Sequence, residues 1–329
     1  MNRIGSRYGW LSYGKETPLA AAKLHLQEFQ TSKEDDVEVP VDPQQFYETL
    51  GLLEHPKTRI PVLGLAPYQI STWLDGFRYK YRLTVKSQKV GLSTSALMED
   101  FQRAILPITH PLSCRGREIL VISQSLKFAE DHLRTLRHMI MASNRYRHLL
   151  IDRPTEVLLR DEVTKVTAIY IKNPDNAFMP TRIIGLGPKE GMVWSWKNVK
   201  HIHMSDVAAS NQIDDSGLFG AAFSRLANTQ GTMHIETPPR GQRGQVWAIY
   251  EASQRKDPAS IMGSFKINHI YAREAVAAGL ILQEFLDSER VRLGPLYGQY
   301  YECEFVNPYT TWYEEKFFKY SDKLAQEVD

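Results

Sequence analysis

The sequence predicts an α/β fold in which a mainly parallel β-sheet is covered by helices on both faces. Apolar segments of strand length alternate with segments of helical periodicity from about residue 65 onward, which is the order expected of such a sheet. The chain has 329 residues, enough for one large domain and a smaller attachment. Its hydrophobic fraction of 43% is typical of soluble globular proteins.

Six segments have the composition of strands, and turn or helix signals separate them. They lie at 81–85, at 118–123 ("EILVIS"), in "VTAIYIK", in "RIIGLG", at 199–206 ("VKHIHMSD") and at 231–239 ("GTMHIETPP"). Apolar residues at helical spacing predict four helices, at 93–105, 126–140, 218–226 and 272–285. Because ligands of such sheets bind at the carboxyl ends of the strands, the polar residues that follow the strands are the first candidates for a site.

Three parts are predicted along the chain. Residues 1–60 form an N-terminal extension of mixed character, and residues 61–258 form the α/β core. Residues 259–329 form a lid or linker subdomain, because the chain there becomes dense in tyrosine and phenylalanine.

Composition excludes several classes of protein. The net charge of +2 does not indicate a generally basic nucleic-acid binder, although it permits a local basic face. No apolar run approaches the ~20 residues of a membrane span, and the N-terminus lacks the apolar core of a signal peptide. Cys114 and Cys303 lie far apart and fit neither a metal motif nor a disulfide framework, which favours a reducing cytoplasm.

The stretch "LTVKSQKVGLSTSALMEDF" has the strand–loop–helix order of a phosphate-binding loop. The usual pattern G-x-x-x-x-G-K-[ST] places its second glycine at Gly91 and its hydroxyl at Ser93. The lysine position then holds Leu92, so a cation would have to come from Lys86 or Lys89. Taken alone, the pattern is also compatible with an ordinary loop between a strand and a helix.

Other motifs occur in order with this loop between residues 65 and 305. The loop "VKSQKVGLST" resembles the variant phosphate loop of the large terminase subunits, viral ATPases that pump DNA into capsids. "LAPYQ" resembles their upstream adenine-contacting element, and "VKHIHMSD" resembles their magnesium-linked strand. "IETPPRGQRG" resembles their coupling motif, and "YGQYYECEF" resembles the segment that leads to their nuclease domain.

The resemblance implies a P-loop NTPase fold of the ASCE-like kind and an ATP- and Mg²⁺-dependent motor that translocates double-stranded viral DNA. It implies that Ser93 and Asp206 manage the Mg²⁺ ion and that Thr237 couples the γ-phosphate state to movement of the lid. It places the following residues at the nucleotide, with Gln69 at the adenine: Gln69, Lys86, Ser87, Lys89, Gly91, Leu92, Ser93 and Thr94. The implied catalytic residues are Lys86, Lys89, Asp206 and a carboxylate that positions water.

That carboxylate is a departure from the family pattern. The family has Asp-Glu at the end of the magnesium strand, whereas here Asp206 is followed by Val207. Glu236, at the end of a neighbouring strand, is the candidate substitute, and Asp214 and Asp215 are weaker ones. The alternative is that Glu236 only pairs with a basic neighbour. Without a substitute, hydrolysis would be slow and the domain would mainly bind nucleotide.

The family also implies partners. These are double-stranded DNA, a portal protein, a small terminase subunit and a ring of identical subunits in the cytoplasm of an infected cell. Arg145 and Arg147 are candidates for an arginine finger supplied to a neighbouring subunit, although a solvated helix face also explains them. The chain ends soon after the linker-like segment, so we expect no nuclease activity from it and a nuclease that is separate or removed.

Two further interpretations stay open at this stage. A helicase-like ATPase of the same fold, or a nucleotide-binding assembly factor without turnover, fits the same motifs. His201 and His203 have the spacing of a metal pair on one face of a strand, but in a sheet buried on both faces they are more often partnered core histidines.

Overall fold

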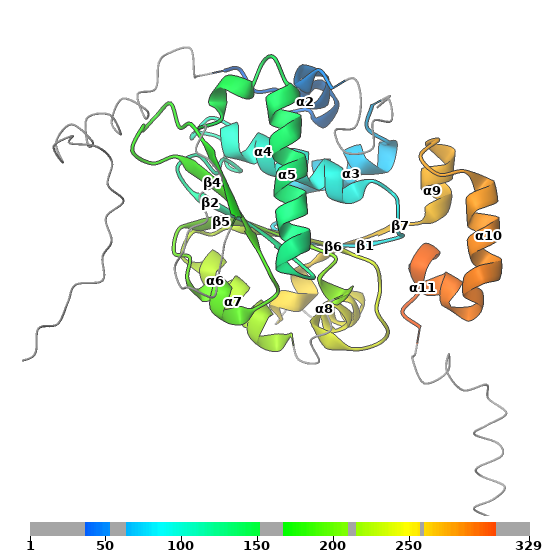
Figure 1. The fold of residues 1–329 in the computed structure, drawn as a ribbon. Helices are drawn as coiled ribbons and strands as arrows, with labels where there is room; N and C mark the ends of the chain where they lie inside the picture. The colour runs from blue at the N-terminus through cyan, green and yellow to red at the C-terminus, as the bar shows by residue number, and fades with distance from the viewer. Residues whose placement is uncertain (1–36, 53–63, 152–166, 210–214, 257–259, 307–329) are drawn as a thin grey trace, which may run out of the picture.

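The computed structural model describes residues 37–52, 64–151, 167–209, 215–256 and 260–306. Within these ranges seven strands form one sheet in the order β3-β4-β2-β5-β6-β1-β7 (Figure 1). The strands are β1 (Tyr81–Lys86), β2 (Glu118–Ser123), β3 (Thr167–Ile171), β4 (Thr181–Leu186), β5 (Val199–Ser205), β6 (Thr232–Thr237) and β7 (Lys266–Ile270). Only the β3–β4 pair is antiparallel, which confirms the mainly parallel sheet.

All six predicted strands are present, and β7 is an additional one that the sequence analysis missed. β7 pairs in parallel with β1 at the edge of the sheet. Its sequence "KINHI" is short and partly exposed at four of its five positions, so it lacks the continuous apolar run of a buried parallel strand. β7 lies within the range assigned above to the lid, so the sheet continues into that range.

Helices cover both faces of the sheet, as predicted (Figure 1). One face is covered by α2 (Pro43–Leu50), α3 (Pro67–Arg78), α4 (Leu92–Ile105) and α5 (Leu126–Ala142). The other is covered by α6 (Glu190–Trp194), α7 (Ser216–Ala227) and α8 (Gly244–Arg255). Short 3-10 helices lie at η2 (Arg147–Leu149), η3 (Val207–Ala209), η4 (Ile261–Ser264) and η5 (Gly294–Leu296).

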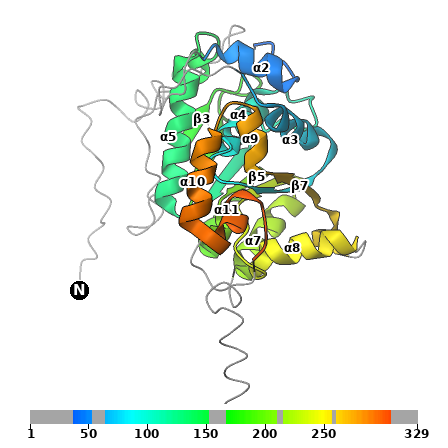
Figure 2. The same ribbon diagram turned by 90° about the vertical axis from the view of Figure 1, so that its right-hand side faces the viewer.

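The helical segment predicted at 272–285 is wrong in one respect, because it contains two helices. α9 (Ala272–Ala277) ends before Gly279, whose φ of +72° lies in the left-handed region that stops a helix, and α10 (Gln283–Leu293) begins after it. With α11 (Tyr297–Tyr301) they form a small cluster beside β7, which faces the viewer in Figure 2. This cluster packs on Val90 and Leu92, so it contacts the loop between β1 and α4.

Cys114 and Cys303 are both buried free thiols. In the part of the chain that the structure describes, no helix is long and apolar enough to cross a membrane.

Candidate active site

A polar layer lies between α4 and three adjacent strands of the sheet, β5, β6 and β1. β1, β5 and β6 alternate apolar and polar side chains, and the polar ones share the face toward α4. Strand register aligns them in rows, because Arg82 lies beside His234 and His234 beside His203. Glu236 lies likewise between Thr84 and Ser205. Three buried polar residues of α4 contact this face: Glu99 pairs with Arg82, Asp100 with His203, and Arg103 with Thr232.

The loop that joins β1 to α4 has the backbone of an anion cradle. Lys89 has a φ of +64°, and Gly91, the N-cap residue of α4, has a φ of +68°. The amides of Ser87 and Gln88 donate to Ile270 O and Tyr300 O. In the described residues, no backbone carbonyl accepts a hydrogen bond from the amides of residues 89–94. These amides at a helix N-terminus are therefore available to phosphate oxygens.

The Lys86 ammonium lies at the centre of the site. Its Nζ is 3.0 Å from Ser93 Oγ, 3.0 Å from Asp206 Oδ1 and 2.7 Å from Glu236 Oε2. Burial by itself lowers the pKa of Lys86, but the carboxylates of Glu236 and Asp206 raise it above its ordinary value, so the ammonium stays charged. Lys86, at the end of β1, is therefore the buried cation of this site, whereas Lys89 is exposed on the loop.

The oxygen atoms around this ammonium suit a Mg²⁺ ion. Ser93 Oγ and Asp206 Oδ1 each lie 3.0 Å from Lys86 Nζ, and Ser205 Oγ lies 3.5 Å from Ser93 Oγ. Hydroxyl and carboxylate oxygens are the ligands that Mg²⁺ takes in phosphate sites. Ser93 and Asp206 would therefore hold a Mg²⁺ ion once Lys86 turned away from them.

Asp206 follows β5 in a strained backbone conformation. Its φ is +54°, and its amide donates to the carbonyl of Glu236 at 2.8 Å. Left-handed backbone at a non-glycine residue costs about 1–3 kcal/mol and recurs at functional sites, although aspartate tolerates it better than most residues. Burial raises the pKa of the Asp206 carboxyl, and the Glu236 charge adds to this effect against the opposing effect of Lys86. The next residue, Val207, is buried in the apolar core, 5% exposed.

Glu236 is fully buried at the end of β6. Neither of its carboxylate oxygens accepts a hydrogen bond from the described residues, and ion pairs at 2.7 Å from Lys86 and 3.5 Å from His203 hold it instead. Burial raises the pKa of Glu236, but the charges of Lys86 and His203 reverse this and hold it below its ordinary value. A buried carboxylate with unused acceptor sites is uncommon, and catalysis is one reason for it.

A cavity of about 540 Å³ opens beside the loop. Its size is typical of small-molecule sites. It is lined by residues from the loop, α4, the start of α5 and the segment after β6, which include Lys86, Lys89, Gly91, Leu92, Ser93, Thr94, Asp206 and Arg240. A cavity of about 600 Å³ between α8 and the C-terminal segment is larger, but its mixed aromatic and charged lining contains neither the loop nor Lys86.

Four other predicted residues lie close to this cavity but do not line it, namely Gln69, Ser87, Glu236 and Thr237. Gln69 donates to Gly91 O at 2.9 Å and accepts from Ala66 N, so its amide braces the loop. The Ser87 hydroxyl is buried and donates to Gln88 O. Thr237 accepts from the amide of Ala208 and donates to Pro238 O, so it links the end of β6 to the segment after Asp206.

The arginine finger candidates lie elsewhere. Arg145 and Arg147 follow the C-terminal end of α5, whereas the cavity lies at its N-terminal end. Arg145 donates to Glu38 O and lies over the ring of Tyr146. Neither arginine lines the cavity of its own subunit.

The sequence analysis missed Asp100. The two histidines that it treated as core residues are buried and partnered, since His203 Nδ1 is 2.7 Å from Asp100 Oδ2 and His201 Nε2 is 3.3 Å from Asp100 Oδ1. In the described residues, no group of three or more His, Cys, Asp or Glu side chains could hold a metal ion. The signal for Asp100 was its position seven residues after Ser93, which places both on one face of a helix.

Comparisons with known proteins give the fold. The chain matches no protein-family model and no curated protein sequence. The large terminase ATPase domain of Thermus phage P74-26 superposes with a TM-score of 0.55 at 15% identity, covering 81% of this chain and 100% of that chain. The HK97 bacteriophage large terminase gives 0.57 at 10% identity, covering 84% of this chain and 55% of that one.

A third similar structure is the large terminase of another thermophilic bacteriophage, in complex with ADP. It gives a TM-score of 0.53 at 10% identity, covering 73% of this chain and 53% of that one. The chain therefore has the fold of large terminase ATPase domains, and the predicted P-loop NTPase-like α/β fold is confirmed.

Proposed function

We propose that this chain is an ATP-hydrolysing motor domain of the large terminase kind, which translocates double-stranded viral DNA into a capsid. The observation that carries the proposal is the position of Lys86, within about 3 Å of Ser93, Asp206 and Glu236 beside a loop with unused amides. The terminase ATPase fold and the ADP in the third similar structure support it.

The residues divide the work by their positions. The amides of residues 89–94 cradle the phosphates, and Lys86 turns from the carboxylates to the β and γ phosphates. Lys89 and Arg240 add charge at the cavity mouth. Ser93 and Asp206 would hold Mg²⁺, which would neutralise the developing phosphate charge when bound.

Glu236 takes the place of the glutamate missing at Val207. Once Lys86 has turned to the phosphates, the Oε2 atom that it leaves orients a water molecule toward the γ-phosphate and accepts its proton. Thr237 accepts a hydrogen bond from the Ala208 amide, and through it the presence or absence of the γ-phosphate is transmitted to the segment after Asp206.

The proposed motor works as a ring of subunits around the duplex. It docks on a portal protein and receives DNA with a small terminase subunit, in the cytoplasm of the infected cell. Arg145 and Arg147 lie away from the cavity of their own subunit. An arginine finger at either position would therefore reach the nucleotide of a neighbouring subunit and not its own.

Phosphate release with and without double-stranded DNA tests the proposal. We expect Lys86→Ala and Glu236→Gln each to lower kcat by about 10²-fold or more. Lys89→Ala should have a smaller effect. Lys197→Ala is the matched control, because Lys197 is exposed just before the amino end of β5, whereas the cavity lies at the carboxyl end. Activity that survives both Lys86→Ala and Glu236→Gln contradicts the assignment.

The same assay separates the two other interpretations. The valine at position 207, where a catalytic glutamate is expected, favours a nucleotide-binding assembly factor. Tight ATP binding without turnover in the native chain would support that function. Unwinding of a tailed duplex would instead favour a helicase-like ATPase.

A further inference from the structure

Glu236 has two cationic neighbours, and the proposed function assigns a task to only one of them. Lys86 must turn toward the phosphates, which leaves Glu236 buried with a full charge. The second cation is His203, whose Nε2 is 3.5 Å from Glu236 Oε1. We propose that His203, held by Asp100, is the positioning residue that keeps Glu236 in place for water activation after Lys86 has left. This inference rests on the proposed function and deepens it.

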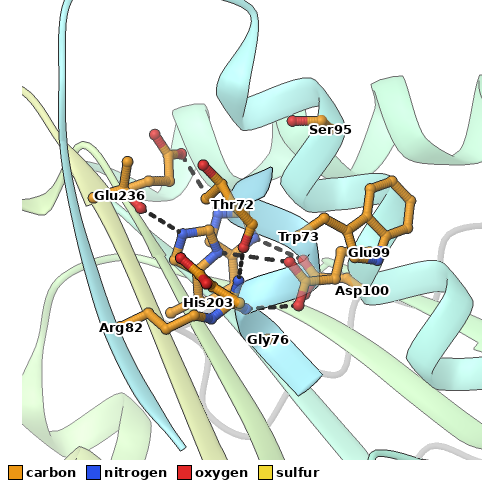
Figure 3. A network of polar contacts seen from close by, with 12 residues as sticks. Thr72, Trp73, Gly76, Arg82, Ser95, Glu99, Asp100, His203 and Glu236 are labelled. Atoms are coloured by element: carbon orange, nitrogen blue, oxygen red, sulfur yellow. Dashed lines mark hydrogen bonds and ion pairs between the residues drawn. The ribbon is translucent and has the colours of Figure 1, made fainter. Parts of the chain in front are cut away.

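The geometry is that of a linear chain of three buried groups from three elements (Figure 3). Asp100 of α4 accepts from His203 Nδ1 at 2.7 Å, and His203 of β5 directs Nε2 toward Glu236 of β6. The three side chains are at most 1% exposed. The Glu236–Lys86 ion pair connects this chain of contacts to the cavity, because Lys86 lines the cavity.

Among the histidines that lie close together here, His203 is the protonated one. Burial lowers its pKa, but Asp100 and Glu236 outweigh this and raise it to about 10. Facing it are also His234 of β6, whose ring stacks on it at 5.8 Å, and His132 of α5. Burial holds the pKa of both these histidines below the ordinary value, so they stay neutral and do not compete for the carboxylates.

His201 shows which part of the arrangement serves Glu236. It lies two residues earlier on the same face of β5, is equally buried and also contacts Asp100, at 3.3 Å. Its other ring nitrogen is 2.7 Å from Thr232 Oγ1, at the far end of β6 from Glu236. His201 therefore shares the burial and the carboxylate of His203 but has no contact with Glu236.

This pair gives a matched experiment on the full chain. We expect His203→Gln to lower kcat for ATP hydrolysis at least roughly tenfold while KM changes less than about threefold, because misplacing a catalytic group affects the chemical step. His201→Gln should lower the melting temperature comparably but change kcat less than about threefold. Equal losses of kcat in both variants would mean a merely structural role and would overturn the proposal.

A second variant tests the order of the chain. Asp100→Asn should lower kcat in the same direction, and the double variant with His203→Gln should lose little more than either single variant, since both interrupt one chain. Fully additive losses contradict the coupling.

A spectroscopic measurement on the native chain covers the case in which the variants do not fold. With ¹⁵N-labelled histidine, one of the ten imidazoles should remain protonated at pH 8, because only His203 has a pKa raised so far in the described part of the chain. If every histidine is neutral at pH 8, the proposal fails. A native chain without ATP turnover contradicts the proposed function, whereas an active one with an unaffected His203→Gln variant contradicts only this inference.

Discussion

Replacing Gly76 by alanine should destabilise the protein, against the usual effect of this change in a helix. Gly76 lies inside α3 and faces a buried ion-pair triad (Figure 3). In the triad, Arg82 Nη2 and Arg103 Nη2 lie 2.6 and 2.7 Å from the same oxygen, Glu99 Oε1. A Cβ at position 76 would stand 2.6 Å from Glu99 Oε1, 2.7 Å from Arg103 Nη2 and 3.0 Å from Arg82 Nη2.

Two opposing effects set the magnitude. Alanine is preferred over glycine in a helix interior by about 1 kcal/mol. The new methyl group must displace either the triad or α3, and breaking a buried ion pair costs roughly 3–5 kcal/mol because a charge is left without its partner. We therefore expect a net loss of about 2–4 kcal/mol. At about 2–4 °C per kcal/mol for a domain of this size, the melting temperature should fall by roughly 5–15 °C.

The α7 residue Gly220 provides the control. It also lies inside a helix, but a Cβ there would meet no atom within 4 Å. Gly220→Ala should therefore raise the free energy of unfolding by up to about 1 kcal/mol. Urea titration of both variants followed by circular dichroism measures the difference. If Gly76→Ala stabilises the protein as Gly220→Ala does, the triad does not pack against α3 as described, and neither α3 nor α4 is fixed to the sheet in this way.

Two further predictions concern the metal and the pH. Ser93→Ala should raise the Mg²⁺ concentration for half-maximal ATP hydrolysis by about tenfold, a loss of about 1.4 kcal/mol, and an unchanged Mg²⁺ dependence would contradict its role as a ligand. The melting temperature should be highest near pH 6.5. Burial lowers the pKa of His201 to about 4, so the unfolded chain takes up its proton first and stability falls as the pH drops from 6.5 toward 4. His203, whose pKa Asp100 raises to about 10 against the effect of burial, loses its contribution as the pH rises from 6.5 toward 10, and His203→Gln should flatten this side of the profile.

The strands around the site could be predicted from the sequence because they alternate apolar and polar residues over the length of a strand. In β1, Leu83 and Val85 alternate with Arg82, Thr84 and Lys86, and both sets are buried. Strand length and composition therefore identified the element even though its period of two resembles that of a half-exposed strand. The parallel direction of most strands followed from their alternation with helices, which did not give the order of the strands in the sheet.

The partners of the polar set were harder to predict. Asp100 reads as one of several charged residues on a helix, and only the packing of α4 on β5 places it beside His203. Strand register decides in the same way that Glu236 lies next to β1 and near Lys86, since Thr84 and Glu236 are paired. Such contacts join residues more than 100 positions apart, so no local pattern contains them.

This sequence departs from the usual motifs at Leu92, where a lysine is expected, and at Val207, where a glutamate is expected. The register of β1 and β6 links the two departures. Leu92, at the position of the missing lysine, is 2% exposed and packs with Val90 against the C-terminal helices, so a charged side chain there would be buried among apolar ones. Lys86, at the other end of the loop, instead ends β1 beside Glu236. There the ammonium offsets the buried charge of a carboxylate that has no hydrogen-bond donor of its own. In the proposed mechanism nucleotide binding draws Lys86 away, and a second cation is then needed to keep Glu236 ionised. A lysine in strand β1, a carboxylate in β6 and a charged histidine in β5 therefore require one another, and a change in any one of them should be tolerated only together with changes in the other two.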